Sequence, residues 1–143
     1  MKKLFLFVSA IALTVSLNSC SSDSDGGARM SFKVDGIKKS FKTFIYSFGG
    51  TTSVYGYTGN VDNPTEEVEF DLTTGTGADK ISNFSYYTAT NDYSPVLFSS
   101  NVTTNSASSA KGTFSGTVEP FGSGADLVIT EGTFSGKVVD DNN

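Results

Sequence analysis

Four carboxylates crowd one short stretch of the chain: Glu66, Glu67, Glu69 and Asp71. Two acids that face each other across a sugar are what glycoside hydrolysis requires. However, Val68, Phe70 and Leu72 alternate with these acids, which is the two-residue period of a half-buried strand. The last three acids then line the solvated face of one strand, with successive members about 7 Å apart. A solvated strand face explains them better than a catalytic pair, and we expect no enzyme.

Tyrosines form the second candidate group, because flat rings with a polar rim suit contact with carbohydrate or protein. The candidate ligand-binding residues are Tyr55, Tyr57, Tyr86 and Tyr87. In the adjacent pair Tyr86-Tyr87, one ring must face the core and the other the solvent, because successive side chains of a strand point to opposite faces. One exposed tyrosine is ordinary, whereas three on one patch would indicate a binding face.

The sequence has no histidine and a single cysteine, Cys20. Zinc, copper, haem and iron–sulfur sites therefore lose their usual ligands, and neither a Ser–His nor a Cys–His catalytic pair can form. Oxygen ligands for calcium occur around Pro64 and in the acidic run 140–142, but without the spacing of a known calcium loop. A turn and a chain terminus explain these runs better, so we expect no metal and no cofactor.

The segment before Cys20 has the pattern of a secretory signal. Lys2 and Lys3 precede the largely apolar run 4–15, which is too short to span a bilayer. Residues 17–20, Leu-Asn-Ser-Cys, resemble the lipobox of bacterial lipoproteins, in which this Cys is lipidated and becomes the first residue of the mature protein. We therefore expect a signal peptide over 1–19, a lipidated Cys20 with a flexible tether over 20–29, and one domain over 30–140.

The charge balance argues against nucleic acid as a partner. Removal of residues 1–19 leaves 8 basic and 15 acidic residues, a formal charge of −7. Such an acidic chain with scattered lysines has no electrostatic footprint for a phosphate backbone. The expected partners are a membrane, through the lipid anchor, and a glycan or another protein.

From Met30 onward the pattern is that of short strands joined by polar turns. Phe32 and Val34 alternate with polar residues, Asp35-Gly36 is a strong hairpin signal, and further alternation follows along the chain. No helical period appears after the signal segment. These features predict an all-β fold, an antiparallel β-sandwich of about seven to nine strands, with a small barrel as the alternative closure.

An internal echo occupies the last third of the chain. Gly-Thr-Phe-Ser-Gly-Thr-Val at 112–118 recurs as Gly-Thr-Phe-Ser-Gly-Lys-Val at 132–138. Two copies are too few for a solenoid, so we interpret them as two strands of one sheet. The glycines in mid-strand predict a bulge or a close contact with a neighbouring backbone or aromatic ring.

The opening Phe-Lys-Val-Asp-Gly at 32–36 and the closing Val-Ile-Thr-Glu-Gly-Thr-Phe-Ser at 128–135, together with the lipobox and acidic tether, resemble a family of small outer-membrane lipoproteins of Bacteroidetes with a β-sandwich domain. The resemblance covers both ends of the mature domain and implies no catalytic residue. It implies an outer-membrane location, and Asp23 and Asp25 after the Cys are similar to signals that send such proteins to the outer face.

Two functions fit these observations. The first is a lipid-anchored, non-enzymatic binding or interaction module. The alternative is a surface assembly or fimbria-like subunit that polymerises by strand addition. The position of Arg29 is similar to that of the arginine at which some lipoprotein pilins of this phylum are cut, which opens a groove for a neighbour's strand. For Arg29, a solvated linker residue is the simpler interpretation.

Overall fold

The computed structural model describes residues 27–140 and contains ten strands and no helix. The signal peptide, Cys20 and most of the tether lie outside the described residues. No helix among the described residues is long and apolar enough to cross a membrane. The strands are β1 (Ala28–Val34), β2 (Ile37–Phe48), β3 (Thr51–Asn60), β4 (Asn63–Leu72), β5 (Gly77–Ala78), β6 (Ile81–Thr88), β7 (Asp92–Asn105), β8 (Ser109–Pro120), β9 (Leu127–Lys137) and β10 (Val139–Asp140).

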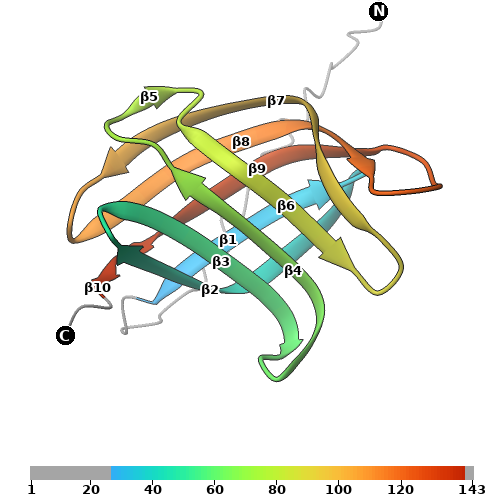
Figure 1. Cartoon of the computed structure of the whole chain (residues 1–143), viewed down its shortest axis with the longest axis horizontal. Coiled ribbons are helices and arrows are strands. Elements are labelled where there is room, and N and C mark those ends of the chain that lie inside the picture. Colours follow the sequence, from blue (N-terminus) through green and yellow to red (C-terminus); the bar gives the residue numbers. More distant parts are fainter. Residues whose placement is uncertain (1–26, 141–143) are drawn as a thin grey trace, which may run out of the picture.

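Eight of these strands close into an antiparallel barrel (Figure 1). Each long strand pairs with the next one along the chain, and β1 pairs with both β2 and β9, which joins the two ends of the meander. The short strands β5 and β10 add to β7 and β2. The prediction of an all-β antiparallel fold is confirmed. The prediction of a β-sandwich is wrong and the alternative, a small barrel, is confirmed, because the sheet closes on itself instead of splitting into two layers.

The first hairpin forms at the turn that the sequence predicted. Asp35 and Gly36 both have positive φ, 48° and 83°, as the two central residues of a type I′ turn require. The Asp35 carboxylate also accepts a hydrogen bond from the Val128 backbone N–H at 2.9 Å. This turn is therefore fastened to the start of β9. The first strand begins at Ala28, two residues before the predicted domain boundary.

The interior of the barrel is filled by side chains, as the diameter of an eight-stranded barrel allows. Phe32 stacks on Phe41 at 4.8 Å between ring centroids and meets the edges of Tyr86 and Phe114 at 5.6 and 5.7 Å. Val54, Val68, Val102, Val118 and Ile129 are fully buried around these rings. Because side chains alternate along each strand, the neighbours of these residues form the outer surface of the barrel.

The two copies of the internal echo lie on β8 and β9, apart from Val138 at the end of the second copy, and pack against each other inside the barrel. Phe114 pairs with Gly132, and Phe134 pairs with Gly112. A Cβ at Gly132 would lie 2.5 Å from the Phe114 ring, and one at Gly112 would lie 2.7 Å from the Phe134 ring. Each phenylalanine thus occupies the space that the opposite glycine leaves free. The predicted contact between mid-strand glycine and an aromatic ring is confirmed.

The wall is weakest between β6 and β7. These strands pair at only two positions, Tyr86 with Tyr93 and Tyr87 with Asp92. Beyond them, Phe84 and Phe98 place their ring centroids 4.6 Å apart, and the Ile81 N–H donates to Ser100 Oγ at 3.2 Å. Aromatic packing therefore closes this part of the wall in place of a backbone ladder.

The interlock between phenylalanine and glycine is testable by Gly132→Ala. The added methyl meets both the ring and the backbone carbonyl of Phe114 at 2.5 Å, so β8 and β9 must move apart. We expect the free energy of unfolding to fall by roughly 1–3 kcal/mol, measured by urea denaturation. The exposed neighbour Thr133→Ala serves as the control and should stay within about 0.5 kcal/mol of wild type. Equal stability of the two variants would contradict the interlock.

Candidate functional site

The outer faces of β2, β3, β4 and β6 carry aromatic and acidic side chains in register. Cross-strand pairing places them in three rows, which together we call the aromatic–acidic face. The rows are Lys42–Tyr57–Glu67–Tyr87, Phe44–Tyr55–Glu69–Ser85 and Tyr46–Ser53–Asp71–Ser82. The Cβ atoms of directly opposed residues in neighbouring strands lie about 5 Å apart, so successive side chains of each row are within contact distance of one another.

The aromatic part of this face is a stack of three rings. Tyr57 lies between Phe44 and Tyr55, with ring centroids 6.0 Å from each and interplanar angles of 12° and 24°. The Lys42 ammonium lies 5.6 Å from the Tyr57 centroid, in cation–π range. Tyr57 is consequently only 7% exposed although it points out of the barrel, whereas Phe44 is 52% exposed. We call the three stacked rings the ridge, and its most exposed ring is Phe44 on β2.

The carboxylates beside the ridge are held by neutral donors. Asp71 accepts hydrogen bonds from Ser53 Oγ at 2.6 Å and from Asn83 Nδ2 at 2.9 Å. Asn83 has a positive φ of 52° at a bulge in β6, where the register with β4 shifts. This bulge displaces Asn83 from simple alternation and brings its amide to Asp71. The carboxylate is thus oriented without being neutralised by a cation.

Glu69 and Tyr87 form a second fixed pair. The Tyr87 hydroxyl donates to Glu69 Oε1 at 2.9 Å across two neighbouring strands. A hydrogen bond with Ser85 lowers the pKa of Tyr87, but desolvation and the Glu69 carboxylate outweigh it and raise that pKa overall. The pKa of Tyr55 is raised by desolvation and by the carboxylate of Glu67. Both phenols therefore stay protonated at neutral pH and keep their O–H donors.

A hollow of about 140 Å³ lies at the third row, where aromatic and polar groups converge. It is lined by Tyr46, Ser53, Val54, Glu69, Phe70, Asp71 and Asn83. Tyr46 supplies an aromatic wall and is 38% exposed. The two carboxylates accept hydrogen bonds, and the amide and the hydroxyl can both donate and accept them. This donor and acceptor set matches a polyhydroxylated ligand of small size.

The structure brings together three of the four predicted tyrosines. Tyr55, Tyr57 and Tyr87 share the aromatic–acidic face, but Tyr57 is buried within the stack, so only Tyr55 and Tyr87 of the predicted set present accessible rings there. Tyr86 is only 1% exposed and points into the barrel, so it does not belong with them. Sequence reasoning missed Tyr46 and Phe44 as members. The alternation of aromatic residues at positions 44, 46 and 48 could have indicated them, because it places these side chains on the same face as the ridge.

Of the four carboxylates that are clustered in the sequence, Glu66 is the one that does not lie on the outer face. It points inward, and its Oε1 lies 2.5 Å from the Lys39 ammonium, which also points inward. Glu67, Glu69 and Asp71 lie outside, so the solvated strand face predicted for them is confirmed. Within residues 27–140, no three metal-ligating side chains lie close enough to hold a metal ion.

Tyr86 lies in the core beside the Lys39–Glu66 ion pair. Desolvation and the nearby Glu66 carboxylate raise the pKa of Tyr86 far above its usual value. The folded state therefore holds this proton more tightly than the unfolded chain does. The corresponding stabilisation is complete below the unfolded pKa of about 10 and is lost as the pH rises above it.

This linkage predicts a steeper alkaline loss of stability in wild type than in Tyr86→Phe. Above about pH 10, the unfolded chain gains free energy by ionising Tyr86, whereas the folded barrel cannot ionise it. The check is urea denaturation at a series of alkaline pH values. Phenolate absorbance, followed in parallel, should show one tyrosine that ionises only on unfolding. Identical pH slopes for the two proteins would rule out the linkage.

Comparison with known proteins gives no family for this chain. No protein-family model, curated protein or solved structure matches it.

Proposed function

We propose that the protein is a lipid-anchored outer-membrane binding module, not an enzyme, and that its aromatic–acidic face binds a neutral carbohydrate. Cys20 supplies the anchor in this proposal and the barrel supplies the contact surface. The observation that carries this proposal is a hollow in which the Tyr46 ring, the carboxylates of Glu69 and Asp71 and the Asn83 amide converge.

The chemistry of this hollow favours a sugar over other small ligands. Sugar hydroxyls donate to carboxylates and accept from amides, and the apolar face of a sugar ring packs on an aromatic ring. Ser53 and Asn83 hold Asp71 in place before any ligand arrives, so less rotamer freedom is lost on binding. The neighbouring ridge extends the surface beyond one sugar unit toward Phe44.

The alternative function, assembly by strand addition, receives less support from a closed barrel. Strand addition needs a free edge with unpaired backbone groups. The ring pairs each of its eight strands on both sides, although the β6–β7 pairing is short. Arg29, the proposed cleavage point, already lies within β1 and pairs with Lys42 and Ser135. Cleavage after Arg29 would remove only the first two residues of β1 and leave the rest of the strand paired with β2 and β9, so it would not by itself open a groove.

The anchor is tested by Cys20→Ala. A buried acyl chain contributes about 0.8 kcal/mol per methylene, so several chains hold a protein on a membrane effectively permanently. We expect the variant in the soluble fraction and wild type in the membrane fraction after cell lysis and ultracentrifugation. The comparable Ser21→Ala variant should remain membrane-bound. Retention of Cys20→Ala on the membrane would overturn the anchor.

The binding face is tested by Tyr46→Ala and Asp71→Asn. The first removes the aromatic wall of the hollow, and the second removes a charged acceptor, so each should weaken sugar binding by at least about tenfold. The measurement is calorimetric titration of the full-length protein in neutral detergent. The probes are maltoheptaose, cellohexaose and xylohexaose, which are neutral oligosaccharides of different geometry.

Two variants control for general loss of aromatic or acidic surface. Phe121→Ala removes an aromatic side chain that is 86% exposed in the loop after β8, and Asp62→Asn removes an acid in the β3–β4 turn. Both should bind sugar as wild type does. If none of the probes binds, or if the Tyr46 and Asp71 variants bind like the controls, the proposed function of this face is wrong.

A further inference from the structure

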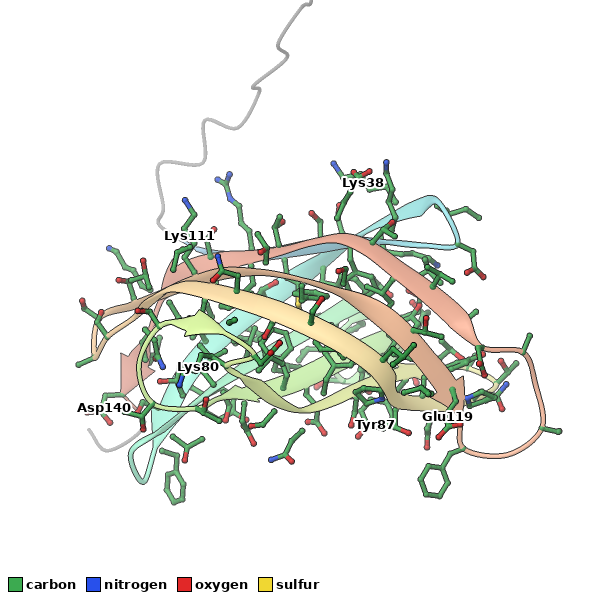
Figure 2. The ribbon with its side chains drawn as sticks, turned by 90° about the horizontal axis from the view of Figure 1, so that it is seen from above. Lys38, Lys80, Tyr87, Lys111, Glu119 and Asp140 are labelled. Atoms are coloured by element: carbon green, nitrogen blue, oxygen red, sulfur yellow. The ribbon has the colours of Figure 1, made fainter. Side chains whose placement is uncertain are left out.

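The wall opposite the aromatic–acidic face carries a different chemistry. In the ring order β1-β9-β8-β7-β6-β4-β3-β2, strand β9 is four strands from β4 in either direction. The two walls therefore face away from each other. In Figure 2, Lys38 and Lys111 project on one side of the barrel and Tyr87 on the other.

Small hydroxyl and amide side chains form a continuous row across this wall. Pairing between β2, β1, β9, β8 and β7 places in register Ser40, Ser31, Thr133, Thr113 and Asn101. The row crosses five strands, a length of about 19 Å at the usual strand spacing. Ser115 and Ser99 pair beside it. We call this row, with Ser115 and Ser99, the hydroxyl groove.

Long cationic side chains border the hydroxyl groove on both sides. Arg29 and Lys111 each pair with Ser135 along one border, and Lys33 pairs with Lys38 along the other. The groove coincides with two adjoining hollows of about 540 and 450 Å³, which share Ser31 and Thr133. The hollows form because short side chains in the middle row lie between long ones in the outer rows.

The charge of the groove is positive although the protein is acidic. Glu131 is the carboxylate that lines it, and it pairs with Lys33 at 2.6 Å. Lys38 and Lys111, which also border the groove, give it a positive balance. Along the floor, Ser31 and Thr133 hydroxyls lie 3.4 Å apart, a long contact that leaves most of their hydrogen-bonding capacity for a ligand.

We infer that the hydroxyl groove binds an extended anionic polysaccharide, such as a polyuronate. The floor hydroxyls pair with sugar hydroxyls, and the bordering cations pair with the carboxylates of the chain. A linear polymer matches the shape, because the row is long and narrow. This site goes beyond the proposed neutral-sugar site and uses none of its residues.

Two other anionic partners fit less well. A flat anionic membrane would reach the bordering cations but not the hydroxyl floor between them. Single-stranded nucleic acid is bound on exposed aromatic rings, whereas Phe32 and Phe114 beneath this floor are 1% and 3% exposed. The acidic face of a second copy of the chain would also complement the bordering cations, and the experiment below distinguishes self-association from polysaccharide binding.

The test is binding of fluorescent polygalacturonate to the full-length protein in neutral detergent, with uncharged dextran as the reference. We expect polygalacturonate binding that weakens as salt rises, whereas any binding of dextran should be insensitive to salt and to variants of the groove. Lys38→Gln and Lys111→Gln should each weaken it about fivefold. Lys80→Gln removes an equal charge near β5, outside the groove, and should leave binding unchanged.

A second variant tests the groove itself without changing the charge. Thr113→Phe places a ring on the floor and should abolish polygalacturonate binding while the barrel stays folded, because Thr113 is exposed. Unchanged binding in Thr113→Phe, or equal losses in Lys38→Gln and Lys80→Gln, would overturn the inference. Capture of the anchor-free Cys20→Ala variant by phosphatidylglycerol vesicles, with no affinity for polygalacturonate, would overturn it in favour of a membrane. Dimerisation lost in both Lys38→Gln and Glu67→Gln, again without affinity for polygalacturonate, would overturn it in favour of self-association.

Discussion

Pairing of β1 with β9 is the constraint on which the rest of the structure depends. It joins residues about a hundred positions apart, such as Lys33 and Glu131, and turns an open meander into a ring. Closure removes the free edges that an open sheet would present. It also fixes what each side chain faces, because alternate residues then point into one enclosed core or out to solvent. The entropic cost of joining the two ends of the chain is offset by aromatic burial, which includes Phe32 on β1 and Phe134 on β9.

The core and the outer surface are built from the same short segments. In each copy of the echo, Gly and Phe point inward and interlock, while Thr and Ser point outward. Thr113, Ser115 and Thr133 form part of the hydroxyl groove, and Ser135 lies on its border. A single alternating pattern therefore serves packing on one side and hydrogen bonding on the other. Strand β6 departs from this regularity on both sides. It pairs with β7 at only two positions, and in its pairing with β4 a bulge at Asn83 brings the Asn83 amide to Asp71.

The two outer walls differ in charge because acids and lysines lie on different strands. Glu67, Glu69 and Asp71 share β4, whereas Lys33, Lys38 and Lys111 lie on strands around β9. The formal charge of the whole chain, −5, does not show that acids and lysines lie on different walls. A charge averaged over the chain argues against nucleic acid as a partner, but it says nothing about how local cations are arranged. Strand order in the ring converts scattered charges into two chemically distinct surfaces.

The sequence by itself determined the strands, the first turn and the side of the barrel on which most residues lie. Two-residue alternation predicted the outward acids of β4, and Asp35-Gly36 predicted the first hairpin, because both are local consequences of backbone geometry. Tertiary structure alone decided between sandwich and barrel, since both have the same alternation and differ only in whether β1 meets β9. It also decided that Tyr55, Tyr57 and Tyr87 come together while Tyr86 is buried. It further placed Tyr46 beside Asp71 and aligned the hydroxyl row across five strands, because these contacts depend on the register between strands that are distant in sequence.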